Sequence, residues 1–64
     1  MSTLNLDPNL SDPDGFYEAL IHCQRELGDE AAELFQARLL LVLANHIGDR
    51  AVLSQAMKVA LAAG

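Results

Sequence analysis

The segment from Asp29 to Ile47 constrains this chain most, because the helix that it predicts has apolar side chains on almost every side. At 100° per residue, the polar side is only a narrow strip that carries Arg38 and Asn45. A helix that is apolar all round is typical of a buried element. Two neighbouring helices of one short chain cannot cover such a cylinder, so the sequence predicts that part of this helix packs against another subunit.

Two Gly-Asp pairs, Gly28-Asp29 and Gly48-Asp49, divide the chain into helices. Each glycine can end a helix in the left-handed conformation, and each aspartate can cap the next helix. Asp12-Pro13 is likewise typical of a helix start. The sequence therefore predicts an all-α fold, a single domain over residues 12–64 with three helices at about 12–27, 29–47 and 49–63.

Residues 1–11 have no helical period and predict an irregular arm. The arm contains Leu4, Leu6 and Leu10 among polar residues and a proline. We expect these leucines to pack on the bundle or on a partner rather than to fray. The alternative to a partner is that the arm covers the remaining apolar face of segment 29–47 within one chain.

Chain length also favours association. With 64 residues the chain buries a small share of its surface, and its single cysteine, Cys23, cannot form an internal disulfide. A lone thiol is typical of a reducing cytoplasm. Oligomerisation is the remaining way to stabilise so small a domain. We expect a homo-oligomer, with a dimer favoured, whose interface core consists of Phe35, Leu39, Leu40, Leu43 and Ile47.

The charge balance excludes several classes of partner. Nine acidic residues against four basic ones give a net charge of −5, which disfavours nucleic acid and anionic membranes. The longest apolar run, 39–44, is far shorter than the ~20 residues that span a bilayer. The sequence therefore predicts a cytoplasmic protein with no nucleic-acid or membrane partner.

Polar residues gather where segment 29–47 ends. Asn45, His46, Asp49 and Arg50 could form a contact for a partner or a small anion, with the following helix start as a further donor. The more economical interpretation is that these residues cap and satisfy a helix joint, with His46 partly buried between Phe35 and Leu39. Two further candidate interaction residues are Arg38, on the polar strip, and Tyr17, whose ring suits an interface.

Catalytic and cofactor chemistry has little support in the sequence. His22, Cys23 and His46 do not have the spacing of a metal site, and no catalytic or cofactor motif is present. Cys23 lies on the apolar stripe of the first helix and is expected to be packed in the core, with His22 at the surface. The sequence predicts a protein that is not an enzyme and binds no cofactor or metal.

Two strings of residues resemble a known family. Asp12-Pro13-Asp14-x-Phe16-Tyr17-x-x-Leu20, and Ala37-Arg38-Leu39 leading into Leu43-Ala44-Asn45-His46-Ile47-Gly48-Asp49, resemble a short bacterial family called domain of unknown function 2783. The resemblance extends from Asp12 to about Ala60 and implies no catalytic residue. It implies an accessory subunit near flavin-dependent oxidoreductases of aromatic catabolism.

The function predicted from the sequence is a non-enzymatic helical interaction protein. We expect it to self-associate through the middle helix and to serve as an accessory subunit of a bacterial complex. The alternative is a small-ligand-binding or accessory subunit of a flavin-dependent oxidoreductase of aromatic catabolism.

Overall fold

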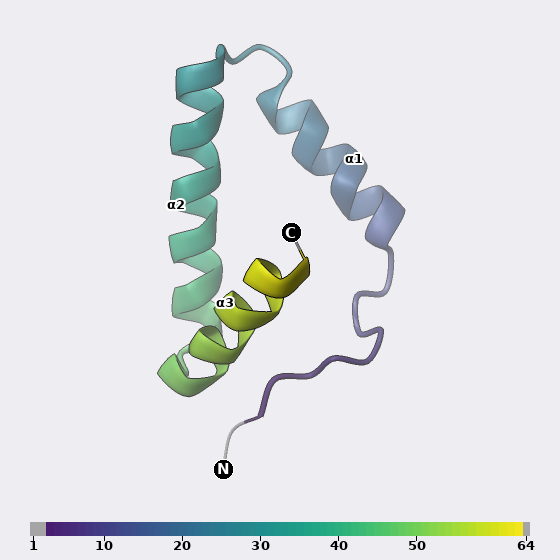
Figure 1. The fold of residues 1–64 in the computed structure, drawn as a ribbon. Coiled ribbons are helices and arrows are strands. Elements are labelled where there is room, and N and C mark those ends of the chain that lie inside the picture. The colour runs from purple at the N-terminus through teal and green to yellow at the C-terminus, as the bar shows by residue number, and fades with distance from the viewer. Residues whose placement is uncertain (1–2, 64) are drawn as a thin grey trace.

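Three helices make up the fold. The computed structural model describes residues 3–63, with α1 at Pro13–Gln24, α2 at Asp29–Ile47 and α3 at Arg50–Ala63, and it has no strand within that range (Figure 1). The predicted all-α class and the three-helix order are confirmed. Met1 and Ser2 of the predicted arm, and Gly64 at the end of the predicted domain, lie outside the described residues.

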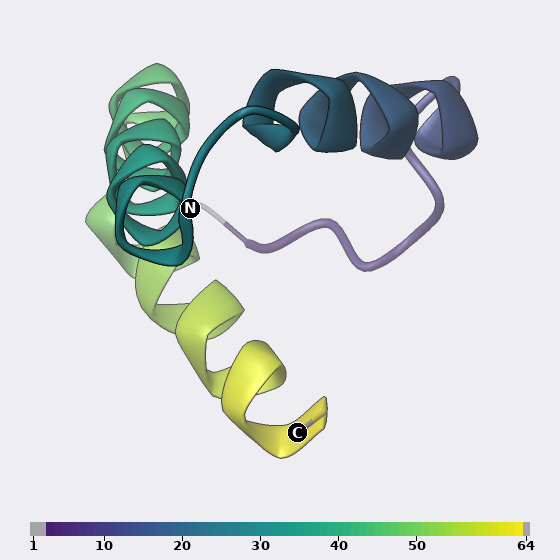
Figure 2. The same cartoon turned by 90° about the horizontal axis from the view of Figure 1, so that it is seen from above.

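The helices diverge from α2 rather than closing into a bundle. α1 leaves from one end of α2 and α3 from the other, and the two point in different directions (Figures 1 and 2). The Cα radius of gyration is 13.5 Å, whereas a compact domain of this length has about 10.7 Å. The chain is therefore more open than an ordinary small domain.

Two of the predicted helix starts are confirmed in detail. Asp12 caps α1, where its Oδ1 accepts a hydrogen bond from the Gly15 N–H at 3.1 Å, and Pro13 occupies the first turn. The Oδ1 of Asp49 accepts from the N–H groups of Ala51 and Val52 at 2.9 and 3.1 Å. These bonds satisfy amides that have no partner within the helix.

The two Gly-Asp joints differ, which corrects the expectation that they act alike. Gly48 ends α2 with φ 68°, as predicted. Gly28 has φ −74° and ψ 171°, so it is the extended N-cap of α2, and Asp29 is the first helical residue. The two joints differ because α1 already ends at Gln24. In the turn after it, backbone amides donate hydrogen bonds to carbonyls three residues earlier. Gly28 is thus too far from α1 to terminate it.

No side chain is buried anywhere within residues 3–63. The chain exposes 5812 Å², whereas a folded monomer of this mass exposes about 4,000 Å². The excess is therefore about 1,800 Å². Cys23 shares this exposure, so its predicted place in a core is wrong. The apolar stripe of α1, on which Cys23 lies, does not pack closely against α2.

The arm is tied to α3. The Leu4 N–H donates a hydrogen bond to Oε1 of Gln55 at 3.1 Å, and the Leu4 side chain is half-buried. Leu6 and Leu10 remain exposed. The alternative that the arm covers the extra face of α2 is wrong, because Leu40 and Leu41 on that helix are 66% and 69% exposed.

Candidate interaction surface

One half of α2 faces the space beside α1. Phe35 and Leu39 share a half of α2 with Gln36 by helical spacing and are half-buried. Nε2 of Gln36 donates a hydrogen bond to Oε1 of Gln24 on α1 at 2.7 Å. That hydrogen bond joins an exposed amide, Gln36, to a half-buried one, Gln24, and is not part of a packed interface. The inner half of α2 is therefore shielded only in part by its own chain.

The predicted interface core divides into two groups. Phe35 and Leu39 are the half-buried pair, whereas Leu40, Leu43 and Ile47 are 66%, 45% and 49% exposed. Removing apolar surface of this kind from water is favourable by roughly 25 cal/mol per Å². The three exposed side chains are thus available to another subunit, and their place in an interface stays a prediction.

The opposite half of α2 carries apolar residues that the predicted interface core did not include. Leu34 and Leu41 are 50% and 69% exposed. With Ala37 and Ala44 they recur at alternating intervals of three and four residues, which is the spacing of a helix-pairing seam. This spacing is present in the sequence and indicates a pairing face, but it is hard to recognise there because apolar residues surround the whole helix.

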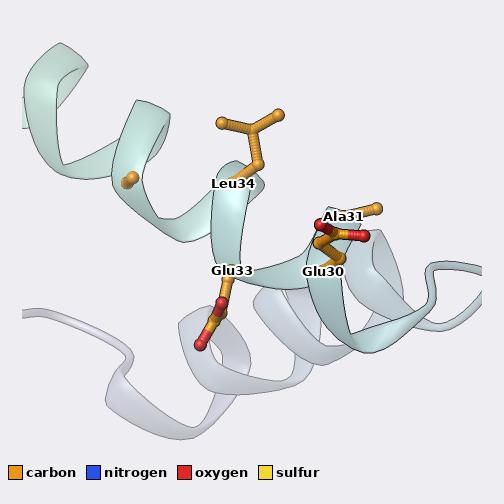
Figure 3. A pocket seen from close by; sticks show the side chains of 5 residues that line it. Glu30, Ala31, Glu33 and Leu34 are labelled. Atoms are coloured by element: carbon orange, nitrogen blue, oxygen red, sulfur yellow. The ribbon is translucent and has the colours of Figure 1, made fainter.

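This half of α2 is also hollowed near its beginning. Glu30, Ala31, Glu33, Leu34 and Ala37 line an open hollow, in which Leu34 and Glu33 point to different sides (Figure 3). Ala31 and Ala37 line it with methyl groups, beside the longer side chains of Glu30, Glu33 and Leu34. The hollow is open rather than an enclosed ligand cavity.

The polar candidates near the end of α2 are at the surface. Asn45, His46 and Arg50 are exposed, and Asp49 is half-buried as the cap of α3. The exposure of His46 corrects the expectation that Phe35 and Leu39 partly bury it. Within residues 3–63 the side chains of Asn45 and His46 make no hydrogen bond, so they are not used to satisfy the joint.

The two remaining candidates, Tyr17 and Arg38, do not lie at the joint between α2 and α3. Tyr17 is 63% exposed and lies on α1, which stands apart from the end of α2 in both views (Figures 1 and 2). Arg38 is exposed on the polar strip of α2, one heptad before Asn45. The polar candidates therefore form one group along α2 and its joint, with Tyr17 separate.

Two of the residues weighed for a metal or catalytic site lie on α1. His22 and Cys23 line an open hollow on α1 with Gly15, Glu18, Ala19 and Arg25. No three His, Cys, Asp or Glu side chains within residues 3–63 are placed to hold a metal ion. In the same range, no helix has the length and apolar character needed to cross a membrane.

Comparison with known proteins gives a family and no activity. The model of a family described as protein of unknown function (DUF2783) matches residues 4–62. No curated protein and no solved structure matches the chain.

Proposed function

The chain belongs to the DUF2783 family of proteins of unknown function, and we propose that it is a non-enzymatic interaction protein that self-associates through α2. The observation that carries this proposal is the absence of any buried side chain within residues 3–63. Folding must offset a large loss of chain entropy, and burial of apolar surface is the main term that does so. A second chain supplies the missing burial.

The size of the exposed surface supports an assembly rather than a passing contact. The excess of about 1,800 Å² per chain exceeds the ~800 Å² that each partner buries in an interface of standard size. For two chains the excess is about 3,600 Å², which falls in the range of obligate homodimers, whose interfaces bury ~2,000–5,000 Å² in total. Leu40, Leu43 and Ile47, the exposed members of the predicted core, would lose surface on association.

The proposed cellular role rests on the sequence. A small helical protein of net charge −5 without a cofactor motif suits the part of an accessory subunit in a cytoplasmic bacterial complex. The proposed partner enzyme, a flavin-dependent oxidoreductase, stays a prediction from the family resemblance. A pull-down from a native cell extract with the tagged chain tests this point, and recovery of the chain alone would count against an accessory role.

The test of self-association is sedimentation equilibrium with circular dichroism on the same samples. Over chain concentrations from about 1 µM to about 500 µM, we expect the mass to rise to a multiple of 6.9 kDa and the helical signal to rise with it. A chain that stays monomeric and fully helical over this range would overturn the proposal. The doubly substituted variant Leu40→Gln/Leu41→Gln serves as the control, because it keeps helix propensity and removes two exposed leucines.

A further inference from the structure

The half of α2 that faces away from Phe35 and Leu39 has the pattern of a specific helix-pairing seam. We call Leu34, Ala37, Leu41 and Ala44 the outer stripe. Large and small side chains alternate along it; Leu34, Ala37 and Leu41 are exposed, and Ala44 is half-buried. Leu40 and Ile47 flank it on one side, with Arg38 and Asn45 on the other.

The hollow in Figure 3 is the kind of recess that such a seam requires. Four of its lining residues, Glu30, Glu33, Leu34 and Ala37, follow the spacing i, i+3, i+4, i+7. Four residues at this spacing surround one point on a helix surface and form the hole that a side chain of a facing helix enters. Ala37 leaves this hole open because it has only a methyl group.

We propose that a second copy of this chain docks on the outer stripe with its α2 antiparallel, an inference that rests on the proposed self-association. In that register Leu34 faces Ala44 of the second copy, and Ala37 faces its Leu41. Every layer then pairs one leucine with one alanine, so the volume between the helices is constant and the axes can approach closely. A parallel pairing would instead stack leucine on leucine and alanine on alanine, with gaps at the alanine layers.

The charges near the ends of α2 favour the same direction. Asp29, Glu30 and Glu33 lie at its beginning, whereas Asp49 and Arg50, just beyond its end, carry opposite charges. Antiparallel docking keeps the two acidic beginnings apart and opposes the two helix dipoles. Parallel docking would bring Glu30 against its own copy in the seam, where like charges repel.

One residue opposes this pairing. Arg38 lies beside the two-fold axis, close to Arg38 of the second copy. Both guanidinium groups are at the exposed edge of the seam, where water and salt screen their repulsion. The leucine–alanine layers along the stripe outweigh this pair.

Cysteine cross-linking distinguishes an antiparallel from a parallel arrangement of the two α2 helices. In a Cys23→Ser background, Leu34→Cys and Ala44→Cys are prepared as separate proteins and oxidised alone and as a mixture. We expect a disulfide dimer only from the mixture, since a disulfide needs Cα atoms within about 7 Å. A disulfide dimer from Leu34→Cys alone would establish a parallel pairing and overturn the proposal.

A matched pair of substitutions tests the stripe without cross-links. Leu41 and Val42 are neighbours with similar exposure, 69% and 65%, but only Leu41 lies on the outer stripe. We expect Leu41→Gln to raise the dimer dissociation constant on the order of 100-fold, because two leucines per dimer lose burial. Val42→Gln is expected to change it by less than about threefold.

The outcomes separate this inference from the proposed function. If the Cys23→Ser protein is a dimer by light scattering, yet neither the mixture cross-links nor Leu41→Gln weakens it, the seam lies elsewhere and only the inference fails. If that protein is a folded monomer at every concentration, self-association fails and the inference fails with it.

Discussion

At the scale of single residues, Gly48 is the position where the backbone most restricts substitution. Its φ of 68° is in the left-handed region, which L side chains adopt at a cost of about 1–2 kcal/mol. We therefore expect Gly48→Ser to lower the free energy of unfolding by about that amount. Thermal unfolding followed by circular dichroism measures the change, at one fixed chain concentration because association shifts the midpoint.

Gly28→Ser is the matched control. Gly28 has φ −74°, nothing lies within 4 Å of an added Cβ, and the residue is an N-cap without a side-chain hydrogen bond. A serine there can cap α2, so we expect the free energy of unfolding to rise by a few tenths of a kcal/mol, about the difference between serine and glycine at an N-cap. An equal loss of stability in both variants would show that backbone conformation does not distinguish the two joints.

These two glycines also mark how far the sequence predicts local structure. The same Gly-Asp pair predicted the same joint twice, and the prediction was confirmed at Gly48 and wrong at Gly28. The glycine's role depends on where the preceding helix ends. For α1 that point was set by the Arg25 and Leu27 amides, which bond to the carbonyls of His22 and Gln24, three residues back. The sequence carries no strong signal for such a loosened last turn.

At the scale of elements, α1 is held to the rest of the chain by few interactions. The Gln36–Gln24 hydrogen bond joins it to α2, and its apolar side chains Phe16, Tyr17 and Ile21 are all more than 40% exposed. Helices with few packed contacts open at low free energy. We expect hydrogen exchange monitored by mass spectrometry to be faster in residues 13–24 than in residues 34–44. Equal protection of the two segments would mean that α1 is packed in solution.

The face of α2 that meets another chain could be predicted only in part. The sequence showed that apolar residues surround the helix, and the exposure of Leu40, Leu43 and Ile47 agrees with a surface left open by the chain itself. It did not show which half would turn toward α1, because an all-round apolar helix has no preferred side. Placing Phe35 and Leu39 inward is what revealed the outer stripe on the other half.

At the scale of the whole molecule, the net charge of −5 makes each pair of chains repel. Salt screens exposed charges, including the two Arg38 groups near the axis of the proposed dimer. We expect the dimer dissociation constant to fall on the order of threefold as salt rises from about 0.05 M to about 0.5 M. Sedimentation equilibrium at several salt concentrations measures it. A dimer that weakens with salt would indicate attractive pairs across the interface, such as Glu33 with Arg38 of the second copy in a parallel arrangement.

Because no side chain within residues 3–63 is buried, the lifetime of the proposed subunit in the cell depends on its concentration. A chain that gains its core from another copy has no separate stable monomer, so dilution unfolds it as effectively as heating does. Unfolded chains are the substrates of cellular proteases. Chains present below the concentration needed for pairing would therefore be degraded, so the subunit would persist only above a threshold of its own abundance.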